Sequence, residues 1–313
     1  MAAGTATPPR QISPNSRLIA RKKRQDRIFA ALGLLCLAVA LATLSLLVVS
    51  LAVDGASRIS WEFFMSFPSR FAARAGILPA WVGTALVLAV TGLIGIPLGI
   101  AAGIYLEEYA PKNWITDIVE INVTNLAGVP SIIYGLLALG LFVYALRLGT
   151  SILTGGLTLA LLILPIVIVA TREAIRAIPM SIREAAYSVG STKWQLISHH
   201  VLPYSTPAIM TGVIIGLSRA IGETAPLVTI GALTFIAFLP APPVQAEFPF
   251  VSFQWLFDPF TVLPIQMFNW VSRPGRDFAS NAAAAGLFLL IVTLAMNGAA
   301  IYLRYHFRKR IKW

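Results

Sequence analysis

Residues 75–106 read AGILPAWVGTALVLAVTGLIGIPLGIAAGIYL and contain no charged side chain. A transmembrane α-helix needs about 20 mostly apolar residues, so this run is long enough to cross a bilayer. A helix is the expected structure, because lipid cannot hydrogen-bond to open backbone groups. Five further runs are predicted to span the membrane in the same way: 28–53, 121–146, 148–171, 203–238, which Arg219 and Glu223 interrupt, and 278–303.

The composition of the whole chain supports this assignment. Of its 313 residues, 57% are hydrophobic and 12% are charged, and the mean hydropathy is +0.78. Soluble domains are about 45–50% apolar and roughly a quarter charged, and longer soluble chains split into domains rather than becoming more apolar. Cys36 is the only cysteine, which excludes an intrachain disulfide and a cysteine-rich metal site. The predicted fold class is an all-α integral membrane protein with six transmembrane helices.

Lysine and arginine indicate how the spans are oriented, because these residues concentrate in cytoplasmic segments. They are most frequent in the N-terminal tail, in the loop 171–203 and at the C-terminus, which six spans put on one side. Both termini are therefore expected in the cytoplasm, and the net charge of +11 needs no nucleic-acid partner. The run 28–53 is longer than the roughly 7–15 residues of a signal-peptide core, so it is interpreted as a retained anchor.

These assignments give a predicted domain organisation. It consists of a basic, largely disordered cytoplasmic tail (1–27), a first transmembrane helix (28–53), an extracytoplasmic loop (54–76), a helical core (77–303) with a cytoplasmic loop at 171–203 and an extracytoplasmic loop at 239–277, and a basic cytoplasmic tail (304–313).

The loop 171–203 carries helix start and stop residues. Ser181 and Glu184 have the spacing of a capping box, and Gly190 suits the left-handed residue that ends a helix. Ser191 or Thr192 can cap a second short helix, which Pro203 is expected to end. The first helix has a shallow apolar face made of Ile182, Ala185, Ala186 and Val189. The pattern alone fits an interfacial connector as well as it fits a docking element.

Arg219 and Glu223 are charged residues inside an apolar run. An arginine near the bilayer centre costs about 2.5–3.5 kcal/mol on insertion scales, and such residues face a bundle interior or water. Their spacing of four lets the two side chains pair on one helix face. Two interpretations remain: an ion pair that fixes one helix against another, or an arginine that attracts an anion while Glu223 orients it. A guanidinium suits an oxyanion because it donates two parallel hydrogen bonds.

Four motifs resemble one family of membrane proteins. The segment 184–203 is similar to the EAA loop of ABC importer permeases, matching at Glu184, Ala185, Ala186, Gly190, Leu202 and Pro203, whereas His200 replaces the usual isoleucine. The segments SRAIGETAPLVTIGA (218–232), LAGVPSIIYG (126–135) and GIAAGIYLEEYAP (99–111) resemble motifs of PstA-type permeases of the phosphate ABC importer. The motifs occur in family order, and the likeness extends from about residue 75 to the C-terminus.

The resemblance implies a type I ABC importer permease with the MetI-like fold, located in the prokaryotic inner membrane. Arg219 and Glu223 are then the expected pathway residues, and we add the nearby hydroxyls of Ser131, Thr224 and Thr84 as candidate phosphate donors. Hydroxyls inside spans more often bond their own helix backbone, which is the alternative for these three residues.

The EAA loop implies a separate motor. In that family it docks on the ATPase, so Arg183, Glu184, Ala185, Ala186 and Gly190 are the expected coupling residues. This chain has no Gly-Lys dipeptide and therefore no P-loop, so it is predicted to be a non-catalytic subunit without a cofactor of its own. A homodimeric PstB-like ATPase would bind ATP and Mg²⁺. A PstC-like permease, a PstS-like phosphate-binding protein, inorganic phosphate and membrane lipid are the other implied partners, and no metal site is expected.

Two alternatives remain open. An Arg…Gly-Glu element also occurs in permeases for molybdate and sulfate, so another oxyanion is possible on that element alone. A secondary transporter could use the buried Arg219–Glu223 pair to relay protons. The EAA-type loop distinguishes the two classes, because a secondary transporter has no ATPase to receive it.

Overall fold

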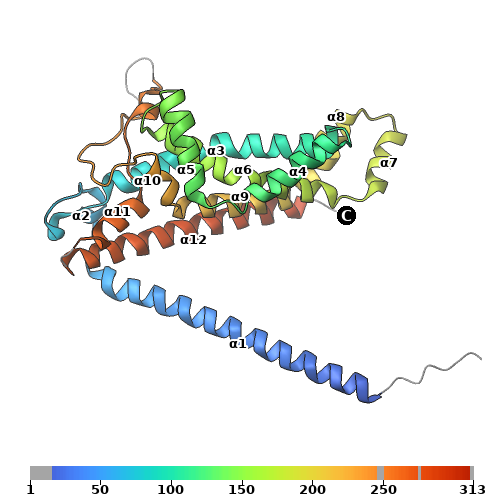
Figure 1. Cartoon of the computed structure of the whole chain (residues 1–313), viewed down its shortest axis with the longest axis horizontal. Helices are drawn as coiled ribbons and strands as arrows, with labels where there is room; N and C mark the ends of the chain where they lie inside the picture. The colour runs from blue at the N-terminus through green and yellow to red at the C-terminus, as the bar shows by residue number, and fades with distance from the viewer. Residues whose placement is uncertain (1–15, 245–249, 274–275, 311–313) are drawn as a thin grey trace, which may run out of the picture. The chain divides into compact units, whose positions relative to one another are not determined.

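The computed structural model describes residues 16–244, 250–273 and 276–310 (Figure 1). Every regular element in these ranges is a helix, and the extended pairings there are the isolated bridges Ser151–Pro259 and Val244–Val251. The predicted all-α class is therefore confirmed. The chain divides into two compact units, 1–50 and 51–313, which are described separately. The part of the predicted disordered tail from 1 to 15 lies outside the described residues.

The described part of the first unit is a single long helix. Helix α1 (Ser16–Gly55) contains the predicted span 28–53, and it begins inside the segment 1–27 that the sequence assigned to a tail. None of the described side chains from 21 to 50 is buried, although most of them are apolar. Residues 28–50 of α1 are mostly apolar and exposed, which suits a lipid environment.

Four helices of the second unit are long and apolar enough to cross a membrane. With α1 this makes five in the described part of the chain, or six if the bent pair α4–α5 counts as one span. The four are α3 (Leu78–Ile104), α6 (Ile152–Arg176), α9 (Leu202–Gly222) and α12 (Ala279–Arg310). Helix α3 continues into the π-helical turn Tyr105–Tyr109. Helix α9 is preceded by α8 (Lys193–Leu196) and by the π-helical turn Ile197–Val201. Residues 304–310, predicted as a tail, thus extend the last helix.

The third predicted span is not one straight helix. In its place lie α4 (Trp114–Leu126) and α5 (Ser131–Ala138), and the helix direction bends by 109° between them. A π-helical segment (Leu139–Ala145) continues α5. Pro130 explains the break, because it lacks a backbone N–H and disfavours helical geometry at the preceding residue. Tyr134 bridges the break, since its hydroxyl donates to the carbonyl of Leu126 at 2.7 Å.

Glycines bring α3 and α6 into close contact. A Cβ atom built on Gly99 would lie 2.7 Å from Cγ1 of Val167, and one built on Gly156 would lie 2.3 Å from Cγ1 of Val90. Gly95, Gly99 and Gly103 line this contact, as expected for small residues at a membrane helix interface. Helix α9 packs on the same α6 through Gly212, which faces Ala170. Figure 1 shows the three helices side by side.

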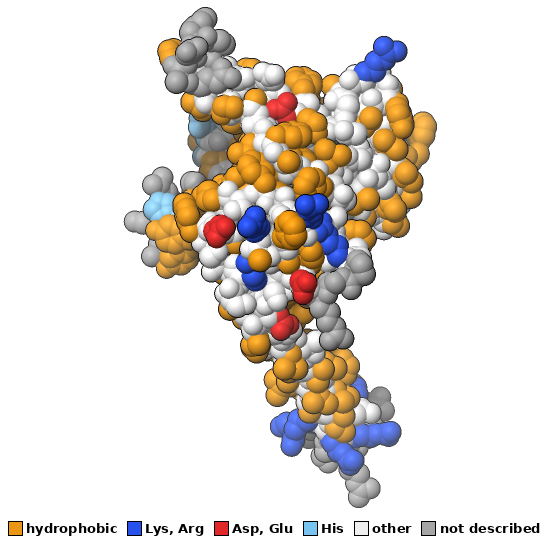
Figure 2. Space-filling model, turned by 90° about the vertical axis from the view of Figure 1, so that its left-hand side faces the viewer, with side chains coloured by type: hydrophobic (Ala, Val, Ile, Leu, Met, Phe, Trp, Pro, Cys, Tyr) orange, Lys and Arg blue, Asp and Glu red, His pale blue; other side chains and the backbone are white. Residues whose placement is uncertain are grey.

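The remaining short elements close one end of the second unit, opposite the end that carries α7 (Met180–Ser188) and α8 (Figure 1). Arg58 ties this end together by donating to Asn281 Oδ1 at 2.6 Å and to three carbonyls between residues 72 and 75. Figure 2 shows basic side chains on this face, and a hollow of about 530 Å³ lies between Arg70 and Asp277. The elements concerned are Ala56–Arg58, α2 (Trp61–Met65), Ala72–Arg74, Gln254–Phe257, α11 (Leu263–Val271) and Arg276–Phe278.

Candidate functional site

The fifth span ends earlier than the sequence predicted. Helix α9 stops at Gly222, Glu223 is extended with φ −78° and ψ 129°, and the short helix α10 (Ala225–Thr229) follows. The rest of the predicted run to Phe238 contains no further helix. Pro226 explains the break, because a continuous helix would need its missing N–H to bond the carbonyl of Gly222. Arg219 therefore lies in the last turn of α9, beside a break in the helix.

The predicted pair between Arg219 and Glu223 is present. Nε of Arg219 donates to Oε1 of Glu223 at 3.3 Å, and the two side chains are 35% and 19% exposed. Within the described part of the chain, the two terminal nitrogens of Arg219 make no hydrogen bond. A guanidinium held through Nε keeps its remaining donors available, and their planar arrangement matches two oxygens of an oxyanion.

Two of the sequence motifs meet at this break. A Cβ atom on Gly135 of α5 would lie 1.8 Å from Oγ1 of Thr229 and 2.7 Å from Cα of Pro226. Only glycine allows the backbones of α5 and α10 to approach so closely. The segments 126–135 and 218–232, which are far apart in sequence, thus form one structural unit around the break.

The three candidate hydroxyls have different surroundings. Thr84 is 5% exposed, donates to the carbonyl of Ala80 at 2.8 Å and accepts from the N–H of Leu263 at 2.9 Å. Its hydrogen bonds join α3 to the start of α11, in agreement with the backbone-bonding alternative. Thr224 and Ser131 are partly exposed, and no side-chain hydrogen bond is seen for either among the described residues. The hollow between Thr84 and Glu223 measures about 10 Å³, room for about one water molecule.

The loop between α6 and α9 forms two short helices, as predicted, but their ends differ. Helix α7 (Met180–Ser188) starts directly after Pro179 without a side-chain cap, so the predicted capping box of Ser181 and Glu184 is wrong. Pro179 already has the fixed geometry that begins the helix, which leaves Ser181 inside the first turn. Gly190 has φ +82°, which confirms the left-handed stop.

The second helix of the loop begins as expected and ends differently. Thr192 and Gln195 form a capping box that starts α8. Pro203 does not end this helix, because the π-helical turn Ile197–Val201 carries the chain directly into α9. Pro203 thus lies inside the continuous helical run Lys193–Gly222, directly after the wider π-helical turn.

The coupling candidates do not share one exposed face. Glu184, Ala185 and Gly190 are exposed, and Val189 is 80% exposed. Ala186 instead packs inward in a cluster with Ile175 and Leu196. The side chain of Arg183 is 16% exposed and pairs with Glu108, so it is bound within the chain. The exposed surface of α7 and the turn after it thus combines the larger Met180, Tyr187 and Val189 with small side chains and one carboxylate.

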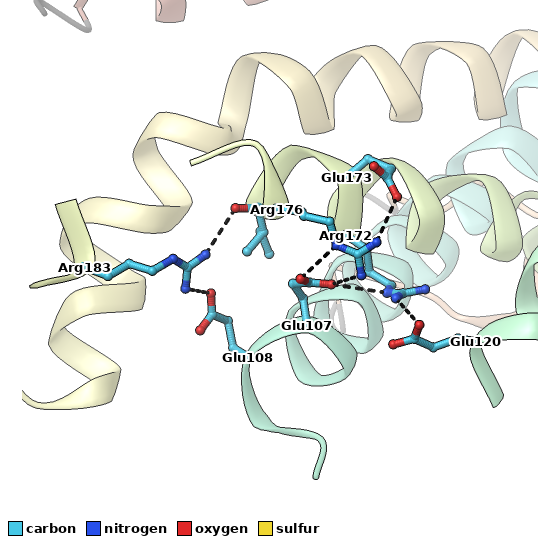
Figure 3. A network of polar contacts seen from close by, with 8 residues as sticks. Glu107, Glu108, Glu120, Arg172, Glu173, Arg176 and Arg183 are labelled. Atoms are coloured by element: carbon cyan, nitrogen blue, oxygen red, sulfur yellow. Dashed lines mark hydrogen bonds and ion pairs between the residues drawn. The ribbon is translucent and has the colours of Figure 1, made fainter. Parts of the chain in front are cut away.

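A network of charged residues that the sequence did not reveal lies beside this loop (Figure 3). Glu107 and Glu108 both form ion pairs with arginines that are far away in sequence. Arg172 lies at the centre, 5% exposed and 2.6 Å from a carboxylate oxygen of Glu120. In the sequence, only the two adjacent glutamates at the end of the run 75–106 pointed to this network, and they do not identify the arginines that bind them.

Comparison with known proteins adds independent evidence. Residues 95–313 match the family described as binding-protein-dependent transport system inner membrane components. The chain is 30% identical over 287 residues to the probable ABC transporter permease protein YqgI of Bacillus subtilis, covering 90% of this chain and 96% of that protein. It is 31% identical over 285 residues to the phosphate transport system permease protein PstA of Yersinia pestis, covering 88% of each.

Solved structures share the fold. A chain of a bacterial alginate ABC transporter superposes with a TM-score of 0.62 at 15% identity, over 90% of this chain and 94% of that one. A chain of the MetNI methionine ABC transporter, in an inward-facing conformation, gives a TM-score of 0.55 at 18% identity, over 72% and 94% of the two chains. The predicted type I importer permease architecture is thereby confirmed.

Proposed function

The chain belongs to the family of binding-protein-dependent transport system inner membrane components, as a PstA-type permease, and from this premise we propose that it forms part of the translocation pathway of an ATP-driven inorganic phosphate importer. The observation that carries the proposal is the guanidinium of Arg219, which is held at a helix break with both terminal nitrogens available. Relatives named for phosphate transport support phosphate as the substrate.

The geometry suggests how Arg219 works. Glu223 engages Nε, which fixes the plane of the guanidinium and leaves its far edge for two oxygens of phosphate. The helix break places this edge where α9, α10 and α5 meet, so a change in their packing alters access to it. Thr224 and Ser131 are proposed as additional donors, whereas the occupied hydroxyl of Thr84 supports a role in packing.

Phosphate differs from other oxyanions in a way that this pair can use. Near neutral pH phosphate still carries an O–H group, which a carboxylate such as Glu223 can accept. Fully deprotonated sulfate and molybdate offer no donor and are repelled by the same carboxylate. The Arg219–Glu223 pair therefore favours phosphate over these alternatives, although Arg219 alone binds any of them.

Transport needs subunits that this chain lacks. We assign ATP and Mg²⁺ binding to a separate homodimeric PstB-like ATPase that contacts the exposed part of α7, because the sequence has no P-loop. A PstC-like permease completes the pathway, and a PstS-like protein delivers phosphate from outside. We propose that both termini and the loop 171–203 lie in the cytoplasm, where lysine and arginine concentrate. Closure of the ATPase moves α7, and the two permeases alternate between inward and outward access.

The experiment is phosphate uptake into proteoliposomes containing the complete complex with Arg219→Gln. Losing one hydrogen bond to a charged group costs about 1.5–3 kcal/mol, so we expect uptake at low phosphate to fall by at least about tenfold. Arg304→Gln is the matched control, since Arg304 donates to Thr211 far from the helix break. Normal uptake by a normally assembled Arg219→Gln complex contradicts the proposal, and unchanged competition by sulfate in Glu223→Gln contradicts the selectivity argument.

A further inference from the structure

The turn that ends α3 contacts the loop 171–203 on one side and the helix bundle on the other. This π-helical turn, Tyr105–Tyr109, contains the adjacent glutamates Glu107 and Glu108. Their side chains point to different partners, as Figure 3 shows. Glu108 faces α7, and Glu107 faces α6. A π-helical turn within a helix often marks a functional position.

Glu108 is attached to both short helices of the loop. Its carboxylate pairs with Arg183 of α7, and the two side chains are 6% and 16% exposed. Arg183 also donates to the carbonyl of Ile175 at 3.2 Å. From α8, Lys193 donates to the backbone carbonyl of Glu108 and lies 4.8 Å from the centre of the Tyr109 ring. The whole loop is therefore fastened to this one turn.

Glu107 continues the connection into the bundle. Arg176 of α6 binds it with two hydrogen bonds, of 3.1 Å from Nε and 2.8 Å from Nη2. Nε of Arg172 lies 3.6 Å from the same carboxylate, and Nη2 of Arg172 lies 2.6 Å from Glu120 of α4. Arg172 thus joins the turn to α4, a helix without a single buried residue.

Helix α4 leads back to the candidate site. It is followed by the break at Pro130 and by α5, whose Gly135 lies against Pro226, next to Glu223 and the end of α9. Contacts lead from α7 through the two glutamates to α4, and the chain then leads through α5 to the contact of Gly135 with Pro226, three residues from Glu223. Ion pairs of this kind add little net stability, but they fix the relative positions of the elements that they join.

We propose that Glu107 and Glu108 are positioning residues that transmit the movement of α7 to α4–α5 and so to the helix break at Arg219. This inference rests on the proposed function, because it requires an ATPase that moves α7. The Glu108–Arg183 pair receives the movement from α7, and Glu107 with Arg172 passes it on to α4. Spatial continuity alone does not establish coupling, so the test must measure coupling itself.

The test measures phosphate transported per ATP hydrolysed in proteoliposomes containing the complete complex. Glu108→Gln and Arg183→Gln should each lower this ratio about fivefold while ATP hydrolysis continues. The double variant should be no worse than either single one, because both substitutions remove the same contact. Glu173→Gln is the matched control: its carboxylate pairs with Arg176 at 3.6 Å, but it is 63% exposed and lies outside the connection.

Unchanged ratios in assembled Glu108→Gln and Arg183→Gln complexes overturn the inference, as do losses that simply add in the double variant. If the buried substitutions prevent assembly, the exposed Lys193→Gln decides: a lowered ratio supports the connection, and an unchanged ratio overturns it. A failure of the proposed function can be told apart from a failure of this inference, because in that case the wild-type complex itself would hydrolyse ATP without transporting phosphate.

Discussion

Helices α6 and α4 lie next to each other and are held in opposite ways. More than half of the residues of α6 are buried, and glycines of α3 and α9 let it pack in direct contact with both helices. No residue of α4 is buried, and its side-chain link to α6 is the ion pair between Glu120 and Arg172. The comparison separates a close-packed scaffold from an element that a few polar contacts hold in place. Elements that move are drawn from the second kind.

The largest effect is expected where the scaffold is tightest. Gly156→Leu places a side chain into space that Val90 already fills, since even a Cβ atom would lie 2.3 Å from it. Overpacking of this kind costs typically 1–3 kcal/mol, and we expect about 3 kcal/mol of lost stability, measured by thermal unfolding in detergent. Gly140→Leu on the bent pair is the control, because nothing lies within 4 Å of its Cβ position. Equal losses in both variants contradict the division into scaffold and mobile element.

The next effect addresses the attachment of α4. Arg172→Gln removes the ion pair with Glu120 and the contact with Glu107. We expect about 2 kcal/mol of local destabilisation, seen as faster amide hydrogen exchange in 114–126 and not in α3. Arg176→Gln leaves Glu120 paired and should leave exchange in α4 nearly unchanged. Protection that is equal in wild type and Arg172→Gln would show that other contacts hold α4.

A smaller effect distinguishes packing hydroxyls from substrate donors. Thr84→Val leaves the N–H of Leu263 without its acceptor and should lower stability by about 1–2 kcal/mol while phosphate affinity stays unchanged. Ser131→Ala should do the opposite, with little loss of stability and weaker phosphate binding. Thermal unfolding together with the phosphate concentration at half-maximal uptake measures both. A changed phosphate affinity in Thr84→Val would show that Thr84 takes part in phosphate binding.

The smallest effect concerns the bend itself. Tyr134→Phe removes the hydrogen bond between the tyrosine hydroxyl and the carbonyl of Leu126 across the break. A single such bond contributes about 0.5–1.5 kcal/mol, so we expect a slight loss of stability and a wider range of angles between α4 and α5. Distances between spin labels on the two helices measure this range in a background lacking Cys36. An unchanged distance distribution would leave Pro130 as the sole cause of the bend.

The sequence was sufficient for the features that depend on local chemistry. Apolar runs marked the membrane-spanning segments, although the third is bent and the fifth ends at Gly222. Gly190 marked the left-handed stop, and the spacing of Arg219 and Glu223 predicted their pair. Pro130 and Pro226 carried the information for both helix breaks, but a proline inside a membrane helix produces a bend in one context and a break in another. The predicted spans 121–146 and 203–238 run through both prolines, so neither break was predicted.

Features that depend on distant partners were beyond the sequence. Arg176 is 69 positions from Glu107, and Arg183 is 75 positions from Glu108, so no local pattern joins them. The capping box of Ser181 and Glu184 failed for a related reason, since Pro179 had already fixed the start of α7. The burial of Thr84 against α11 likewise depends on a segment 179 positions away.

The π-helical turn at Tyr105–Tyr109 also constrains how the chain length can vary. Such a turn accommodates one residue more than an α-helical turn, and each residue of an α-helix advances by about 100° around its axis. Deleting Leu106, which precedes both glutamates, would place Glu107 and Glu108 one position earlier along the helix and so point their side chains in different directions. Neither carboxylate would then meet its arginine. A deletion of one codon at this turn is therefore expected to uncouple ATP hydrolysis by the ATPase from phosphate transport while the chain still folds.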